Sequence, residues 1–178
     1  MAEIQLETSR LFLRPIELSD SPVILKYRSD AEANKYQGWV PKNLEDVHDF
    51  ICHRVCRQIN QAGSWFQLVI IRKDSGELIG DIGIHFLTEE PFCTELGITV
   101  DQEHWNKGFA NEALSEVITF LFLRLGKQKI IVSIDPRNKP SIKLFERLGF
   151  VQEFYTEKSF FLNGEWVDDL VMGLQLSE

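Results

Sequence analysis

Hydrophobic positions at the start of the chain first alternate with polar ones and then recur with helical spacing. Residues 10–16 alternate between apolar and polar side chains and therefore predict a strand. Ser19 or Asp20 can cap a helix that has Pro22 in its first turn, and short helical segments are then expected to about Asn34.

A longer helix is predicted next, because one helical face carries Leu44, Val47, Ile51, Val55 and Ile59. We expect this helix to begin at Asn43 and to end before Gly63, which would close it. Residues 64–87 follow as two apolar, β-branched runs around an Asp-Ser-Gly turn, which is the pattern of a β-hairpin.

Single strands and helices then alternate up to a terminal hairpin. The pattern predicts a strand over 93–100, a helix after Gly108, a strand over 129–134, a helix over about 139–148 closed by Gly149, and a hairpin of 153–162 and 165–176 around Asn163 and Gly164. A helix between single strands is typical of a parallel pair, so residues 93–100 and 129–134 should be parallel neighbours. The fold class is α/β (α+β), with one mixed sheet. The loop before the Gly108 helix should lie at the carboxyl end of a strand, where such sheets bind ligands.

Composition narrows the classes of protein. With 178 residues, 44% of them hydrophobic, and no linker or repeat, we expect one domain over residues 1–178. No apolar run approaches a membrane span and the amino terminus lacks a signal-peptide pattern, so a cytoplasmic protein with no membrane partner is expected. A net charge of −8 without a basic tract argues against nucleic acid and leaves room for a cationic substrate.

Cysteine and histidine positions do not predict a metal site. The three cysteines are odd in number and have no zinc-finger or Cys-x-x-Cys spacing, so free thiols are expected. His48, Cys52 and Cys56 would share a helical face, but these three side chains border apolar residues, and packing at the edge of the core explains them better than metal binding.

The segment "HWNKGFANEA" at the start of the Gly108 helix carries a candidate anion site. A helix amino terminus exposes unpaired N–H groups, and a glycine there lets an anion approach the backbone. Residues 105–111 could therefore hold a phosphate or pyrophosphate, with Lys107 adding a charge. The alternative is that Gly108 only turns the chain into its helix.

The same segment resembles the acetyl-coenzyme A motif of the GCN5-related N-acetyltransferases (GNAT). In "ELGITVDQEHWNKGFANEAL", Gly108 and Ala110 match the two small positions, while Trp105 stands where Gln or Arg is expected. With a tryptophan at this position, the segment resembles the branch of the family that acetylates ribosomal-protein amino termini, where tryptophan is common. The stretches "TSRLFLRPIELSD", "RNKPSIKLFERLGF" and "LNGEWVDDLVMGL" resemble other parts of that branch in the expected order.

The resemblance implies an acyl-CoA N-acyltransferase fold, with a mostly antiparallel sheet of about seven strands flanked by helices. It also implies acetyl transfer from acetyl-CoA, without a metal, to a primary amine that attacks directly in a ternary complex. The amine could belong to a protein amino terminus, a polyamine, an aminoglycoside or another metabolite. The alternative is an acetyl-CoA-binding sensor without turnover, and the protein could be a monomer or a homodimer.

The family pattern also implies which residues bind the coenzyme. The backbone of Ile98, Thr99 and Val100 should pair with the pantetheine arm, and an N–H near Ile98 should polarise the thioester carbonyl. The full set expected to bind the coenzyme is Ile98, Thr99, Val100, Asn106, Lys107, Gly108, Phe109, Ala110, Asn111, Asn138, Ser141 and Phe145.

Catalytic roles are less well specified by the pattern. Phe145 occupies the place of a tyrosine that protonates the thiolate in many members, so Ser141, one turn earlier, is the candidate acid or hydrogen-bond donor to sulfur. Ser141 could equally be an ordinary first-turn residue. Glu95 is the candidate base and could contact the substrate, or it could be a solvated or ion-paired carboxylate.

Two further residues are weaker candidates for the acceptor side of the site. His85 is the second candidate base, because an imidazole titrates near neutral pH, although a lone histidine in a strand is more often structural. Among the aromatic residues, Trp39 is the one expected to line the substrate pocket, while most of the others should belong to the core.

Overall fold

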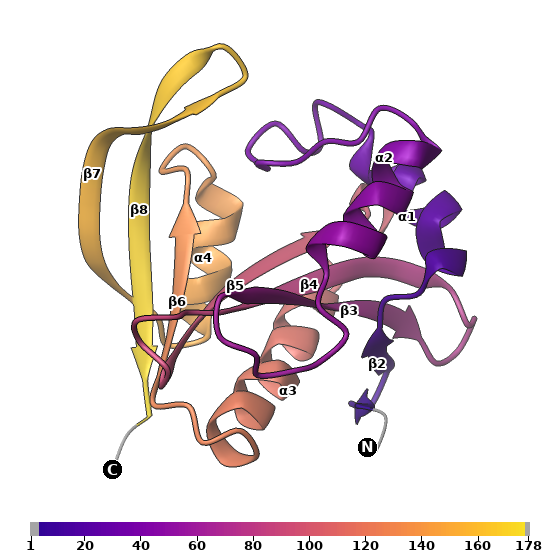
Figure 1. Cartoon of the computed structure of the whole chain (residues 1–178), viewed down its shortest axis with the longest axis horizontal. Helices are drawn as coiled ribbons and strands as arrows, with labels where there is room; N and C mark the ends of the chain where they lie inside the picture. Colours follow the sequence, from indigo (N-terminus) through magenta and orange to yellow (C-terminus); the bar gives the residue numbers. More distant parts are fainter. Residues whose placement is uncertain (1–3, 177–178) are drawn as a thin grey trace.

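Eight strands form one sheet in the order β1-β2-β3-β4-β5-β6-β8-β7 (Figure 1). The computed structural model describes residues 4–176. The strands are β1 (Leu6–Glu7), β2 (Leu11–Pro15), β3 (Ser64–Arg72), β4 (Leu78–Phe86), β5 (Cys93–Val100), β6 (Lys129–Ile134), β7 (Val151–Leu162) and β8 (Glu165–Gln175). The helices are α1 (Ser21–Arg28), α2 (Leu44–Asp49), α3 (Phe109–Leu123) and α4 (Lys139–Arg147), with short 3-10 turns at Leu18–Asp20 and Gln102–His104.

The predicted mixed, mostly antiparallel sheet is confirmed. Every neighbouring pair of strands is antiparallel except β5 and β6, which are parallel as their helical connection predicted. The sheet has one strand more than the seven expected, because the two-residue β1 is too short to show an alternating pattern. None of the helices within residues 4–176 is long and apolar enough to cross a membrane.

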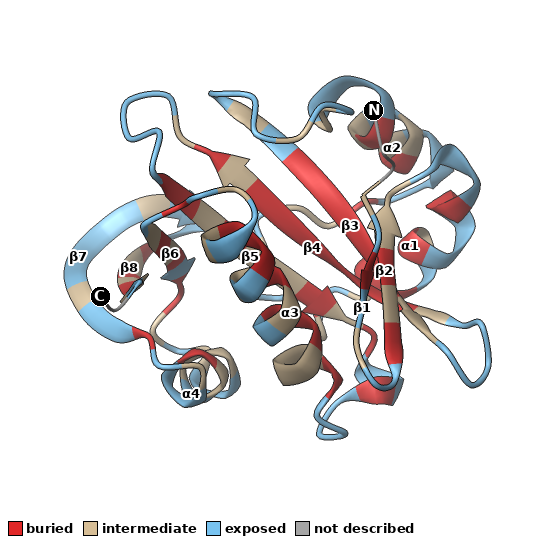
Figure 2. Cartoon of the chain, turned by 90° about the horizontal axis from the view of Figure 1, so that it is seen from below, coloured by how far each residue is buried: buried red, intermediate tan, exposed pale blue. Residues whose placement is uncertain are grey.

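Helices cover both faces of the sheet. On one face, α3 packs against the central strands (Figure 2). Its buried stripe consists of Phe109, Ala113, Leu114, Val117, Phe120 and Leu121. On the other face, Ile24 and Tyr27 of α1 and Val47 of α2 pack with Val69 of β3. This second layer covers only part of its face, and β7 at the far edge is mostly exposed.

A buried ion pair fixes α1 on the sheet. Arg28 Nη2 lies 2.6 Å from Asp81 Oδ2, and the Tyr27 hydroxyl donates to Asp81 Oδ1 at 2.8 Å. Burial raises the pKa of Tyr27, and the neighbouring Asp81 carboxylate raises it further, so the phenol stays protonated. Asp81 pairs in register with Thr99 of β5, so this anchor places the segment after α1 beside that strand.

The two parallel strands separate soon after they begin. Residues 93–95 of β5 pair with residues 129–131 of β6, and the register ends there, while β6 continues along β8. One edge of β5 beyond Glu95 is therefore free, and it faces the opening between the two strands.

The prediction of a long helix from Asn43 to about Ile59 is wrong. The α-helix ends at Asp49, and a π-helical turn, Phe50–Arg54, leads into an extended backbone at Val55. Val55 forms a parallel bridge with Trp65, and the Cys56 N–H donates to Trp65 O at 2.7 Å. Because β2 pairs with β3 only from Leu68 on, the start of β3 takes its backbone partners from this segment instead.

Candidate active site

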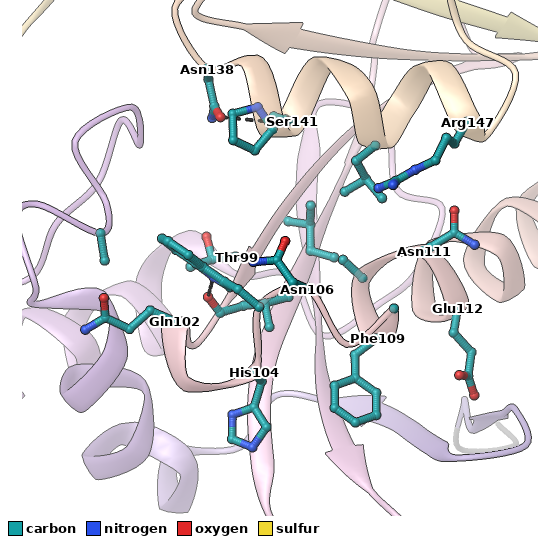
Figure 3. Close-up of a pocket in the computed structure, with 18 of the residues that line it drawn as sticks. Thr99, Gln102, His104, Asn106, Phe109, Asn111, Glu112, Asn138, Ser141 and Arg147 are labelled. Atoms are coloured by element: carbon teal, nitrogen blue, oxygen red, sulfur yellow. Dashed lines mark hydrogen bonds between the residues drawn. The ribbon is translucent and has the colours of Figure 1, made fainter.

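A cavity of about 1400 Å³ lies where β5 and β6 separate. Its walls are the edge of β5, the start of α3, the inner side of α4, the β1–β2 loop and residues 32–37 (Figure 3). Ten of the residues predicted to bind the coenzyme line it: Ile98, Thr99, Val100, Asn106, Gly108, Phe109, Ala110, Asn111, Asn138 and Ser141. Segments distant in sequence thus meet around one hollow.

The free edge of β5 presents backbone groups to this cavity. The carbonyl of Val100 accepts a hydrogen bond from Trp105 Nε1 at 2.7 Å, and Gln37 Nε2 lies 3.5 Å from Ile98 O. Both carbonyls therefore point away from β4. In a strand the N–H of a residue lies on the same side as its carbonyl, so the N–H groups of Ile98 and Val100 face the opening. An extended ligand can pair there as an added strand.

The start of α3 is open to an anion. Asn106 and Gly108 have φ values of +60° and +81°, so the chain makes a left-handed bend before the helix. No side chain within the described residues caps this helix terminus. Its first N–H groups and the positive end of the helix dipole therefore face the cavity. Lys107 does not line it, because its ammonium group donates to Glu103 O at 2.7 Å.

Arg10, from the amino-terminal hairpin, holds this bend in place through contacts with Glu112 and Lys107, which we call the Arg10–Glu112 bracket. The Arg10 Nε lies 2.6 Å from Glu112 Oε2, the Arg10 backbone N–H donates to Glu112 Oε1 at 2.9 Å, and Arg10 Nη1 donates to Lys107 O at 3.1 Å. Partial burial would raise the pKa of Glu112, but hydrogen bonds from Thr8, Arg10 and Ser9 outweigh burial and lower it to about 2. The Glu112 carboxylate, in the first turn of α3, is thus ionised, and it already accepts hydrogen bonds from the amino-terminal hairpin.

Sequence reasoning missed this bracket. Arg10 and Glu112 lie 102 positions apart, and Arg10 belongs to a stretch that predicted only a strand. A charged residue at the beginning of that strand was the only local signal. The Arg10 guanidinium also packs over the Phe109 ring, 4.5 Å from its centroid, which ties the hairpin to the first residue of α3.

At the start of α4, Asn138 and Ser141 lie on the cavity wall. The Asn138 side chain caps the helix by accepting the Ser141 N–H at 3.3 Å (Figure 3). The Ser141 hydroxyl makes no hydrogen bond to any described residue, so it is available to a ligand. Phe145 is only 2% exposed and packs edge-on against Phe150 at 5.1 Å. The structure therefore places Phe145 in the core and not on the cavity wall.

Glu95 and His85 lie side by side on the sheet face opposite α3. Glu95 Oε2 is 3.2 Å from His85 Nδ1, and the His85 ring stacks on Trp65 with 4.6 Å between centroids. Neither residue is part of the cavity wall. Between Glu95 and the wall residue Thr99 stands Gly97, above which a Cβ would meet nothing within 4 Å. The sheet surface between this pair and Thr99 is therefore not filled by a side chain at Gly97.

Trp39 does not reach the cavity wall. Its ring stacks on Phe50 at 4.2 Å and packs against the cluster beneath α1 and α2. The neighbouring residues 32–37 line the cavity instead.

One side of the cavity is bounded by contacts from the terminal hairpin. Asn163 in its turn donates to Lys35 O at 3.0 Å, and Arg137 Nη1 lies 2.6 Å from Glu165. Arg137 also pairs with the buried Asp135 at 2.6 Å. Residues 32–37 and the hairpin thus meet over the opening between β5 and β6.

This geometry defines a class of protein. A sheet split between two parallel strands, with a free strand edge leading to an uncapped helix terminus, is the arrangement of an acyl-coenzyme A N-acyltransferase fold. A family model described as an acetyltransferase (GNAT) domain matches residues 10–151.

Curated relatives carry the same activity in their names. The uncharacterized N-acetyltransferase p20 of Bacillus licheniformis is 35% identical over 149 residues, which cover 83% of each chain. The spermidine N(1)-acetyltransferase of Vibrio cholerae is 32% identical over 164 residues, 90% of each chain. The ribosomal protein uS5-alanine N-acetyltransferase of Escherichia coli is 25% identical over 178 residues, covering 97% of this chain and 91% of its own.

Solved structures show the same fold. A GNAT-family acetyltransferase from Bacillus anthracis has a TM-score of 0.84 at 24% identity, covering 97% of this chain and 98% of its own. A spermidine N-acetyltransferase from Vibrio cholerae, in complex with CoA and spermine, has a TM-score of 0.78 at 23% identity, covering 94% and 96%. The chain belongs to the GNAT acetyltransferase family, and it is an acetyl-CoA-dependent N-acetyltransferase.

Proposed function

We propose that the protein transfers the acetyl group of acetyl-CoA directly to a primary amine in the opening between β5 and β6. The observation that carries this proposal is the free edge of β5, which leads from Ile98 to the uncapped start of α3 along one cavity wall. Pantetheine needs an unpaired strand edge and pyrophosphate needs clustered N–H donors, and both are present at the two ends of that wall.

The residues present suit the coenzyme. The backbone of Ile98 and Val100 would hold the pantetheine arm, while the backbone groups of Thr99, between them, face β4. The N–H of Ile98 would polarise the acetyl carbonyl. The bend from Asn106 to Asn111 would hold the pyrophosphate through main-chain N–H groups. The bracketing Arg10 supports this assignment, because it neutralises Glu112, whose carboxylate would otherwise face the phosphates. Acetyl-CoA supplies the activated acetyl group.

The attacking amine must lose a proton, and we propose Glu95 as the group that accepts it, directly or through water. Support comes from the open space above Gly97, between Glu95 and the wall residue Thr99, and from the hydrogen bond to His85, which orients the carboxylate. His85 is the alternative base in the same pair. Glu95 is about 10 Å along the strand from Ile98, since a strand rises about 3.3 Å per residue, so a bridging water fits the geometry better than direct contact.

The departing thiolate gains a proton, and Ser141 is the proposed donor or hydrogen-bond partner of the sulfur. Its hydroxyl is free and lies in the first turn of α4. The positive end of that helix dipole also favours a negative charge on sulfur. Because a thiolate is a fair leaving group, this contact assists the reaction without being essential to it.

For the acceptor, we propose an amine that carries further positive charge. The net charge of −8 favours a cation, and the Vibrio cholerae relative is named as a spermidine acetyltransferase. Glu95, beyond the cavity wall, supplies a carboxylate for such a ligand.

Release of free coenzyme A thiol tests the proposal. Purified protein, acetyl-CoA and single amines would be compared: spermidine, a peptide with an amino-terminal alanine, and an aminoglycoside. We expect thiol release above the rate of spontaneous hydrolysis with at least one amine, and mass spectrometry should find the acetylated product. Tight coenzyme binding without release for any amine would instead support the sensor alternative, which the phenylalanine at position 145 motivates.

Location and assembly are further parts of the proposal. Cys52, Cys56 and Cys93 are free thiols, as in proteins of a reducing compartment, so we propose that the enzyme acts in the cytoplasm. We propose a monomer or a homodimer. The exposed aromatic side chains Phe154 and Trp166 on the β7–β8 hairpin favour contact with a second copy. Sedimentation velocity measures the assembly.

A further inference from the structure

Arg147, the last residue of α4, lies on the cavity wall without an ionic partner. Within residues 4–176, its guanidinium makes no hydrogen bond or salt bridge. The other lysine and arginine side chains on the wall are engaged: Arg10 with Glu112, Arg137 with Asp135 and Glu165, and Lys35 with Glu32. Arg147 is thus the cation of this cavity that is available to a ligand.

The position of Arg147 relates it to one end of the bound coenzyme. From Lys139 to Arg147, α4 is about 12 Å long at 1.5 Å per residue. Its first turn, with Asn138 and Ser141, faces the end of the cavity proposed for sulfur. Its last turn lies across from α3, where Asn111 forms the opposite wall (Figure 3). The nucleotide end of the ligand should therefore lie between α3 and Arg147.

The chemistry of coenzyme A explains why an unpaired guanidinium is useful there. The coenzyme has a pyrophosphate and, in addition, a phosphate on the ribose 3′-oxygen. Such a phosphate monoester carries about −1.5 to −2 charges at neutral pH. The N–H groups of the bend before α3 serve the pyrophosphate, and they leave the third phosphate without a partner. A guanidinium binds a phosphate with two parallel hydrogen bonds.

The remaining charges make this contact more important. The chain has a net charge of −8, and Glu116 of α3 also lines the cavity. Without Arg147, this end of the cavity would repel a doubly charged phosphate.

We propose that Arg147 binds the 3′-phosphate and makes the protein select coenzyme A over 3′-dephospho-coenzyme A. This inference rests on the proposed coenzyme site.

Calorimetry with the two ligands tests the inference on the full chain. Wild type, R147Q and K143Q would each be titrated with coenzyme A and with 3′-dephospho-coenzyme A. Lys143 is the matched control, because it lies one turn earlier on α4, is exposed, and does not line the cavity. Both variants remove one positive charge, so a general change in the electrostatic field affects them equally, whereas a direct contact affects R147Q alone.

We expect wild type and K143Q to bind coenzyme A about three- to tenfold more tightly than the dephospho form, as for a solvent-accessible ion pair with a doubly charged group. In R147Q the two affinities should become equal, through weaker binding of coenzyme A alone. Equal affinities in wild type, or the same loss in K143Q as in R147Q, would overturn the role of Arg147 and leave the acetyltransferase site intact. If wild type bound neither ligand, the proposed coenzyme site would be refuted together with the role of Arg147.

Discussion

Replacing Gly108 by valine should separate coenzyme binding from folding. Gly108 has a φ of +81°, and a Cβ there would lie 3.3 Å from Arg10 Nη2. A residue with a Cβ pays about 1–2 kcal/mol in this left-handed conformation. The bend can relieve this strain only by rotating, which turns the N–H groups at the start of α3 away from the phosphates.

The magnitude follows from the contacts that such a rotation removes. A hydrogen bond to a charged group contributes about 1.5–3 kcal/mol, so the loss of one of them weakens coenzyme binding about 10- to 100-fold. The backbone strain should also lower the midpoint of thermal unfolding by about 2–8 °C for a chain of this length. Titration calorimetry with coenzyme A and a thermal melt measure the two effects independently.

Gly126→Val is the matched control. Gly126 also has a positive φ, +67°, and a Cβ there would meet nothing within 4 Å; it does not line the cavity. The Gly126→Val variant should therefore lose about as much stability as Gly108→Val and keep the wild-type affinity for coenzyme A. If Gly108→Val bound coenzyme A within about twofold of this control, a difference well below one charged hydrogen bond, the bend would not hold the phosphates and our placement of the pyrophosphate would be refuted.

Three further predictions address the acceptor path, the leaving group and the bracket. Gly97→Val fills the open space beside Glu95, so it should raise the KM for the amine about tenfold or more while the Kd for coenzyme A is unchanged; an unchanged KM would remove the acceptor from this path. Ser141→Ala should lower kcat about fivefold, as expected for one hydrogen bond, and a loss above about a hundredfold would instead make Ser141 an essential acid. Glu112 has a pKa lowered to about 2, so its charge stabilises the fold above the unfolded pKa of about 4.5 and this contribution disappears as the pH falls towards 2. The difference in unfolding midpoint between wild type and Glu112→Gln should accordingly be large at pH 7 and small near pH 2, and a constant difference would contradict the assignment.

Elements whose pattern is local could be predicted from the sequence. The α3 stripe that includes Leu114 and Val117, the Asn163-Gly164 turn with φ values of +50° and +88°, and the β5–β6 parallel pair were all confirmed. The helix expected to reach Ile59 failed for a non-local reason. Its apolar spacing was helical, but the start of β3 has a free edge on the side of β2 and offered backbone partners to residues 55 and 56, and this tertiary pairing prevailed.

The candidate site likewise has features that the local sequence predicts and features that depend on tertiary contacts. The bend at Gly108 lies within one short motif and was visible in the sequence. The Arg10–Glu112 bracket joins two segments that only the sheet brings together, and the significance of Arg147 depends on which cationic side chains already have partners. Neither property is encoded in a local spacing, so both required the structure.

Helical spacing alone also gave an incomplete description of α4. Ser141 and Phe145 are four residues apart and were expected to face the coenzyme together, yet Ser141 lies on the cavity wall and Phe145 is buried against Phe150. The stripe that carries Ser141 and Phe145 meets the cavity at the first turn of α4 and the core at the second, while Leu144 and Arg147 continue along the cavity wall. A tyrosine hydroxyl at position 145 would have to emerge from that core to reach a thiolate. The phenylalanine is therefore consistent with its packing, and Ser141 stays our proposed donor to the sulfur.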